Sequence, residues 1–152
     1  MEAWLPIRGF DGYSVSTHGR IRSDKSGGAI LKPSINKDGY QRIGLYVRGM
    51  GKKTVNVHRV VAEHFVEGWA PDLETRHRDG NPSNNFVENL RWGTHSENTL
   101  DKVSHGTHTQ AAKRSCPSGH EYSADNTYQW NGTRACRKCR SSVRAKRKLA
   151  AA

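Results

Sequence analysis

The sequence is poor in the residues from which hydrophobic cores and disulfide frameworks are built. Only 34% of its 152 residues are hydrophobic, and the mean hydropathy is −0.87. This composition argues against one large core and favours small modules supported by metal or DNA contacts. The chain has 3 cysteines, an odd number, which excludes a fully paired disulfide framework.

Long apolar runs are also missing. No stretch is long enough to cross a membrane, and the first residues, MEAWLPIRG, lack the apolar segment of a signal peptide. We therefore expect a cytoplasmic protein, in the host cell if it is phage-encoded, with no membrane partner.

Acidic residues are scarce relative to basic ones. The 14 Asp and Glu stand against 25 Lys and Arg, for a net charge of +11, and none of the acidic residues lies between residues 126 and 152. This imbalance predicts a polyanionic partner, because neutralising phosphates releases counterions and drives binding. A basic run by itself also fits a solvated tail.

The segment from Glu74 to Asn98, ETRHRDGNPSNNFVENLRWGTHSEN, is rich in polar and turn-forming residues. Residues 79–82, Asp-Gly-Asn-Pro, predict a turn. Residues 90–92 predict a short strand, and residues 94–97, Thr-His-Ser-Glu, fit a capping box at the start of a helix. The segment is expected to fold as strand, loop, strand and helix.

Three residues of this segment are candidates for an active site. His77 ends the first predicted strand and Asn98 lies one turn inside the helix, so we expect both at one small cavity. The spacing of His77, Asn89 and Asn98, together with the Asp-Gly-Asn turn, resembles the HNH or ββα-metal motif of phage- and intron-encoded homing endonucleases. Without that spacing, they would read as a surface histidine and ordinary turn residues.

The resemblance implies a role for each residue. His77 would be the general base that takes a proton from water, Asn89 would brace the loop that orients it, and Asn98 would help hold Mg²⁺ or Mn²⁺ against the scissile phosphate. These residue types suit the chemistry, since neutral imidazole accepts a proton near pH 7 and a hard cation stabilises developing charge on oxygen. The family hydrolyses phosphodiester bonds and leaves 5′-phosphate ends. One such site cuts one strand, so we expect a monomer that nicks double-stranded DNA, with a dimer as the alternative.

One position departs from the family pattern. Many relatives carry a metal-binding residue directly before the general base, whereas this sequence has Arg76, which cannot bind a cation. Glu74, Asp79 or a substrate phosphate would have to complete the metal shell. The alternative interpretation is a non-catalytic, zinc-containing DNA-binding protein that retains a degenerate HNH scaffold.

The N-terminal third predicts short strands that contact DNA. Residues 1–23 resemble the small module that often precedes HNH domains in phage homing endonucleases, and residues 39–57 alternate as a hairpin. Basic residues on these strands are candidate DNA contacts, although solvated strand faces are often basic: Arg20, Arg22, Arg42, Arg48, Lys52 and Lys53.

The next segment, residues 56–66, carries an apolar helical stripe with Asn56 as a possible N-cap. Its histidines, His58 and His64, are expected to pack or face solvent, because no cysteine or acidic partner lies at ligand spacing. Residues 104–115 are interpreted as a linker.

All the cysteines lie in the last third of the chain. Cys116, His120, Cys136 and Cys139 form C-x3-H and C-x2-C pairs that match a structural Cys3His site for Zn²⁺. A disulfide or a redox pair is the less favoured interpretation. A basic, helical tail follows the site, and its candidate DNA contacts are Arg140, Arg144, Lys146 and Arg147.

Together these patterns predict a modular α+β protein. We expect a β-rich DNA-contact region at residues 1–55, an HNH nuclease domain at 56–104, and a linker, zinc module and basic tail at 105–152.

Overall fold

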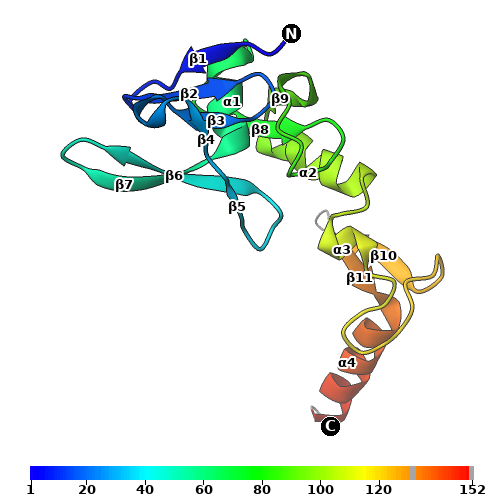
Figure 1. Cartoon of the computed structure of the whole chain (residues 1–152). Coiled ribbons are helices and arrows are strands. Elements are labelled where there is room, and N and C mark those ends of the chain that lie inside the picture. Colours follow the sequence, from blue (N-terminus) through cyan, green and yellow to red (C-terminus); the bar gives the residue numbers. More distant parts are fainter. Residues whose placement is uncertain (131–132, 151–152) are drawn as a thin grey trace. The chain divides into compact units, whose positions relative to one another are not determined.

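The computed structural model describes residues 1–130 and 133–150 (Figure 1), with the side chains of Trp130 and Lys148 left undescribed. The chain forms two compact units, unit 1 from Met1 to His105 and unit 2 from Gly106 to Ala152. Both contain helices and antiparallel strands, which confirms the predicted α+β class. No helix within the described ranges has the length and apolar content needed to span a bilayer.

Unit 1 begins with two small antiparallel sheets. The first has four strands in sequence order, β1 (Trp4–Pro6), β2 (Tyr13–Ser16), β3 (Ile21–Ser23) and β4 (Ala29–Ile30). The short helical turn η1 (Asp24–Ser26) lies between β3 and β4. The second sheet contains β5 (Ser34–Ile35), β6 (Gln41–Val47) and β7 (Gly51–Asn56), and the β6–β7 hairpin extends away from the rest of the unit (Figure 1). The predicted hairpin at residues 39–57 is therefore confirmed.

The second half of unit 1 is a helix, a hairpin and a helix. Helix α1 (Val57–Phe65) is followed by β8 (Glu74–His77), the turn η2 (Val87–Asn89), β9 (Leu90–Gly93) and α2 (His95–Ser104). Strands β8 and β9 pair antiparallel, with His77 opposite Leu90. The capping box is present, because Thr94 Oγ1 accepts from the Glu97 backbone N–H and the Glu97 side chain accepts from that of Thr94.

One hydrophobic core holds unit 1 together, and α1 lies at its centre. The buried apolar stripe of α1 contacts strands of the N-terminal sheets and of the β8–β9 hairpin. The core therefore joins residues from the predicted DNA-contact region and from the predicted nuclease domain: Ile7, Tyr13, Val15, Ile21, Ile43, Leu45, Val57, Val60, Val61, Ala62 and Leu90.

Unit 2 has little apolar interior. It contains α3 (Thr109–Ala112), a hairpin of β10 (Thr127–Trp130) and β11 (Thr133–Cys136), and α4 (Arg137–Ala150). Helix α3 lies within residues 104–115, which the sequence had suggested were only a linker. Among the described residues of this unit, the buried ones are Cys116, Asn126 and Cys136.

Candidate functional site

The loop between β8 and β9 is closed by polar side chains. Asn89 Oδ1 accepts from the Asp79 backbone N–H at 3.0 Å, and Asn89 Nδ2 donates to Asp79 Oδ1 and to the Asn84 carbonyl, both at 2.9 Å. Asp79 Oδ2 accepts from Asn84 Nδ2 at 2.7 Å. Asn89 thus fixes both ends of the loop that follows His77.

His77 lies at the end of β8 and is buried, with 8% of its surface exposed. Its ring packs beside those of His58 and Tyr40, with centroids 5.2 and 5.9 Å away. Burial disfavours the charged imidazolium and lowers the pKa of His77 below its ordinary value, which the hydrogen bond to Asn85 opposes in part. The ring is therefore neutral at pH 7 and able to accept a proton.

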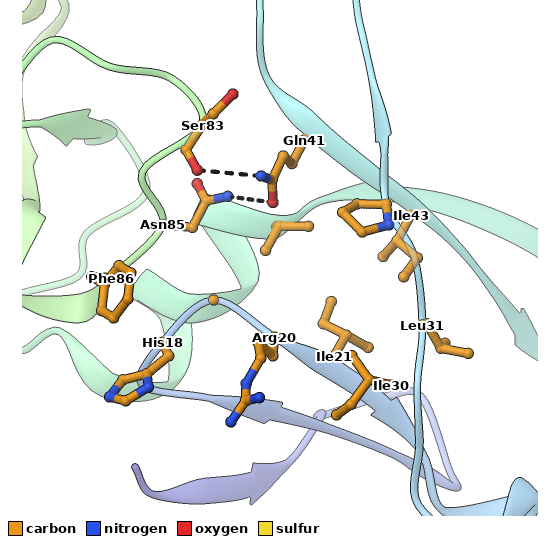
Figure 2. Close-up of a pocket in the computed structure, with 13 residues that line it drawn as sticks. His18, Arg20, Ile21, Ile30, Leu31, Gln41, Ile43, Ser83, Asn85 and Phe86 are labelled. Atoms are coloured by element: carbon orange, nitrogen blue, oxygen red, sulfur yellow. Dashed lines mark hydrogen bonds between the residues drawn. The ribbon is translucent and has the colours of Figure 1, made fainter. Parts of the chain in front are cut away.

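A chain of amides fixes which ring nitrogen of His77 carries the hydrogen, and Figure 2 shows its members Ser83, Gln41 and Asn85. The Ser83 carbonyl can only accept, so Gln41 donates to it through Nε2 at 3.3 Å, and Gln41 Oε1 then accepts from Asn85 Nδ2 at 3.0 Å. Asn85 Oδ1 is left facing His77 Nε2 at 3.4 Å, so this nitrogen must donate. His77 Nδ1 is consequently the acceptor. The sequence had indicated neither Gln41 nor Asn85.

The same two amides border a cavity between the first sheet and the β8–β9 loop (Figure 2). Its volume is about 310 Å³, and its lining includes His18, Arg20 and Phe86. The rings of His18 and Phe86 pack in a tilted arrangement, with centroids 4.9 Å apart and an interplanar angle of 39°. The cavity thus brings an arginine and two aromatic rings to the amides that orient His77.

Arg76 faces α2 rather than a metal site. Its Nε and Nη2 each lie 2.8 Å from Asp101 Oδ2, and its Nη1 lies 3.1 Å from Glu97 Oε1. The side chain is 7% exposed, and Arg91 contacts the same Asp101 carboxylate at 3.1 Å. Arg76, the residue that departs from the family pattern, thus takes part in an ion-pair network that holds α2 against the hairpin.

Asn98 has a different set of neighbours from His77. Asn98 Nδ2 donates to Glu74 Oε2 at 2.5 Å, and Glu74 Oε1 lies 2.8 Å from His95 Nδ1. The hydrogen bonds from Asn98 and His95 lower the pKa of Glu74, so its carboxylate is ionised at neutral pH. Alternation along β8 places Glu74 and Arg76 on one face and His77 on the other. The structure thus places His77 and Asn98 in two groups of side chains on different faces of the strand, rather than at the single small cavity expected from the sequence.

Comparison with known families matches residues 2–46 to the NUMOD4 motif and residues 55–100 to HNH endonucleases. Residues 55–100 belong to the HNH endonuclease family. This HNH segment spans α1, the β8–β9 hairpin and the first half of α2, and it contains His77, Asn89 and Asn98. The resemblance noted in the sequence is confirmed for the N-terminal module and for the HNH motif, whereas the matched ranges end before the cysteines.

Individual relatives agree with this assignment of the HNH segment. The chain is 50% identical over 105 residues to DNA endonuclease I-HmuI of Bacillus phage SP01, covering 68% of this chain and 59% of the relative. It is 35% identical over 125 residues to the uncharacterized HNH endonuclease L245 of Acanthamoeba polyphaga mimivirus, covering 82% and 36%. A solved structure of DNA binding and cleavage by the HNH homing endonuclease I-HmuI matches with a TM-score of 0.63 and 47% identity, over 69% of this chain and 60% of that one. The chain thus spans less than two thirds of the length of these relatives.

HNH nucleases use divalent metals, and the side chains around Asn98 suit such an ion. Glu74 supplies an ionised carboxylate, Asn98 an amide oxygen after rotation of its side chain, and His95 an imidazole nitrogen. The Asp79 carboxylate is already used within the HNH loop.

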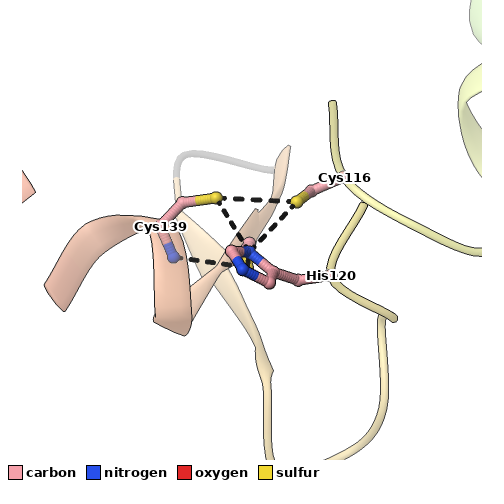
Figure 3. Close-up of side chains that lie close together, drawn as sticks. Cys116, His120 and Cys139 are labelled. Atoms are coloured by element: carbon pink, nitrogen blue, oxygen red, sulfur yellow. Dashed lines mark hydrogen bonds between the residues drawn. The ribbon is translucent and has the colours of Figure 1, made fainter. Parts of the chain in front are cut away.

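Beyond the HNH segment, four side chains of unit 2 converge as a second candidate metal site, and Figure 3 labels three of them, Cys116, His120 and Cys139. The ligand atoms of Cys116, His120, Cys136 and Cys139 all lie within 4.8 Å of one another. Cys116 Sγ is 3.5 Å from Cys139 Sγ, and His120 Nδ1 is 3.3 Å from Cys139 Sγ. A tetrahedral zinc ion with Zn–S of about 2.3 Å would set its ligand atoms roughly 3.5 to 3.8 Å apart.

The candidate DNA contacts differ in how far their charge is already balanced. Arg20 pairs with Glu2, and Arg22 pairs with Asp24 at 3.1 Å while lying over the Trp4 ring at 4.6 Å. The candidates on the β6–β7 hairpin and on α4 are exposed: Arg42, Arg48, Lys52, Lys53, Arg140, Arg144, Lys146 and Arg147. The hairpin and α4 therefore carry most of the basic surface that the sequence predicted.

The burial of His58 predicts that the folded chain loses stability in acid. Its Nδ1 is buried and has no hydrogen-bond partner among the described residues, and burial, with His77 and Arg59 nearby, lowers its pKa to about 4. Tyr40 also packs against its ring. The unfolded chain takes up this proton near pH 6.5 and the folded chain does not, so stability present above pH 6.5 is lost as pH falls towards 4. We expect a loss on the order of 3 kcal/mol.

Urea unfolding at pH 7.0 and 4.5, followed by circular dichroism, measures this effect. The variant His58→Gln should reduce the pH dependence, leaving the contributions of His77 and of carboxylates with lowered pKa values such as Glu74 and Asp101. If the free energy of unfolding of the variant fell as much between pH 7.0 and 4.5 as that of the wild type, the lowered pKa of His58 would be refuted.

Proposed function

We propose that the chain is a DNA endonuclease that hydrolyses phosphodiester bonds with His77 as general base and one divalent ion near Asn98. The observation that carries the proposal is the fixed state of His77 within the HNH segment. Its ring is buried and neutral, and the Asn85–Gln41 pair leaves Nδ1 as the acceptor. A general base needs an acceptor nitrogen of this kind within reach of water.

In this mechanism His77 Nδ1 takes the proton of the attacking water, and Asn85 stabilises the imidazolium through Nε2–H. Asn89 keeps the following loop closed, so the histidine does not shift as it gains charge. A bound Mg²⁺ or Mn²⁺ would stabilise the negative charge that develops on the phosphate and on the departing 3′ oxygen. Water and leaving group lie on opposite sides of phosphorus in an in-line displacement.

The DNA-binding part of the proposal rests on the basic surfaces. The β6–β7 hairpin presents exposed arginines and lysines, and a two-stranded ribbon fits the major groove. In unit 2 we propose a structural Zn²⁺ at the Cys3His cluster, because four protein ligands leave no open position for water. The ion would hold α4 so that its basic side chains contact phosphates.

Arg76 favours a second candidate function, a DNA-binding protein whose HNH scaffold no longer cleaves. Its position carries a metal ligand in many relatives, and here it holds α2. This candidate predicts DNA binding that does not depend on divalent ions and no cleavage in their presence.

Supercoiled plasmids carrying fragments of the source genome separate the two candidates. With Mg²⁺ or Mn²⁺ we expect relaxed circles with 5′-phosphate ends, because one active site cuts one strand, and no product in EDTA. Linear product at the earliest times would indicate paired sites and a dimer. Retarded but uncut plasmid with either ion would support the DNA-binding protein.

A further inference from the structure

Resting on the proposed function, we propose that Glu74, His95 and Asn98 form the divalent-metal site of this chain, with Glu74 as its charged ligand. Glu74 begins β8, whereas His95 and Asn98 lie on the first turn of α2. The site would replace a ligand at position 76 by one two residues earlier, on the same face of the strand.

Arg76 cannot serve this purpose, and its contacts show what it does instead. The guanidinium is permanently charged and is held by Glu97 and Asp101. Because both carboxylates are engaged by arginine, neither is free to bind a cation at this position. A metal ligand on this face of β8 must therefore come from another residue.

Asp79 is excluded on similar grounds. Its Oδ1 accepts from the Asn81 backbone N–H at 2.8 Å and from Asn89 Nδ2, and its Oδ2 accepts from Asn84 Nδ2. Turning this carboxylate towards a metal ion would break three hydrogen bonds and open the loop that follows His77. Glu74 does not stabilise the loop in this way, since its hydrogen-bond partners are the other two proposed ligands.

The Glu74 group has the spacing and the chemistry of a metal shell. Glu74 Oε1 lies 2.8 Å from His95 Nδ1, and Glu74 Oε2 lies 2.5 Å from the amide nitrogen of Asn98, whose oxygen is the proposed ligand atom. Neighbouring ligand atoms of an octahedral ion bound at about 2.1 Å are roughly 3 Å apart, so small adjustments admit the ion. The Asn98 amide must rotate to present Oδ1, which costs little because its hydrogen bond to Glu74 is replaced by the shared ion.

The group is both held in place and open on one side. His95 and Asn98 are three residues apart and share one helix face, and the Thr94–Glu97 capping box fixes the start of that helix. The side chains of Glu74 and His95 are 41% and 79% exposed. Three protein ligands facing solvent leave coordination positions for water and for a substrate phosphate, which a catalytic ion requires.

One nitrogen ligand sets the expected metal preference. Mg²⁺ favours oxygen ligands and dehydrates reluctantly, whereas Mn²⁺ accepts imidazole more readily. The site should therefore bind Mn²⁺ more tightly than Mg²⁺. The thiolates of unit 2 do not compete for Mn²⁺, since soft ligands select zinc.

Electron paramagnetic resonance of Mn²⁺ added to the zinc-loaded full chain tests the site without any cleavage assay. We expect Glu74→Gln to weaken Mn²⁺ binding at least tenfold, since removing even the outer partners of a metal costs roughly 10- to 100-fold. Glu63→Gln is the matched control, because Glu63 is exposed on α1 and pairs only with Arg59 in these contacts. Pulsed measurements should also detect coupling of Mn²⁺ to an imidazole nitrogen, and this signal should vanish in His95→Gln.

The outcomes separate this inference from the proposed function. Mn²⁺ binding that is unchanged in Glu74→Gln, or a nitrogen signal that persists in His95→Gln, would overturn the metal site even if the wild type nicks plasmid. Failure of the wild type to bind Mn²⁺, alone or with duplex DNA in a His77→Ala background, would overturn it as well. A wild type that binds Mn²⁺ through these residues but cuts no DNA would retain the site and refute the nuclease.

Discussion

Replacing His77 with alanine is expected to lower the rate of plasmid nicking by about 10²- to 10⁴-fold, the usual contribution of a general base. The side chain is buried beside His58 and Tyr40, and its Nε2 donates to Asn85, so the variant loses the acceptor at Nδ1 and leaves a small cavity. DNA affinity should stay within about twofold, because neutral His77 contributes no charge to the phosphate contacts that dominate affinity.

A second substitution separates chemistry from folding. His77→Gln keeps a donor for Asn85 and most of the volume but has no basic nitrogen, so it should be as inactive as alanine while unfolding nearly like the wild type. His105→Gln, at an exposed histidine that follows α2, should nick at the wild-type rate. Substantial nicking by His77→Gln would remove His77 from the role of base and leave water activation to another group.

Losing zinc is expected to unfold unit 2 while unit 1 stays folded. Few apolar side chains are buried in the described part of unit 2, and a unit of this length rarely folds on so small a core. Structural zinc supplies about 10 to 16 kcal/mol of apparent binding free energy to small domains. Cys136→Ser should therefore lose the ion, the ordered β10–β11 hairpin and the helical signal of α4.

Three measurements test this prediction. Zinc content by mass spectrometry should fall from one ion per chain to none, and amide spectra should lose dispersion only for residues after 105. DNA affinity should become less dependent on salt, since the phosphate contacts of α4 are lost. Ser141→Ala, at an exposed position on α4, should behave like the wild type. Retention of a folded unit 2 without zinc would mean that the four side chains do not hold the unit together.

Local features of the fold could be predicted from the sequence because they depend on neighbouring residues. The capping box of Thr94 and Glu97 lies within one helical turn, and the apolar stripe of Val57, Val60 and Val61 follows the period of a helix. The position of His77 at the end of a strand and the grouping of the cysteines could likewise be predicted. In each case the atoms that interact are only a few residues apart, or follow a known ligand spacing.

The features that could not be predicted depend on residues far apart in the chain. Gln41 and Asn85 are 44 residues apart, and Arg76 and Asp101 are 25 apart, so no local rule links them. A glutamine on an alternating strand looks like any solvated residue until packing brings it to a histidine. Nor could composition show that a chain with 34% hydrophobic residues builds one core across the two predicted N-terminal regions.

The shared core also determines whether a truncated chain can stay folded. Val57, Val61 and Leu90 are covered in part by Val15, Ile21 and Leu45, which come from the N-terminal sheets. A fragment that began after β7, whether made by proteolysis or by internal translation, would expose the core face of α1 and unfold. The HNH segment therefore depends on the N-terminal sheets to stay folded, and a chain that has lost them would also lose any activity that the HNH segment carries.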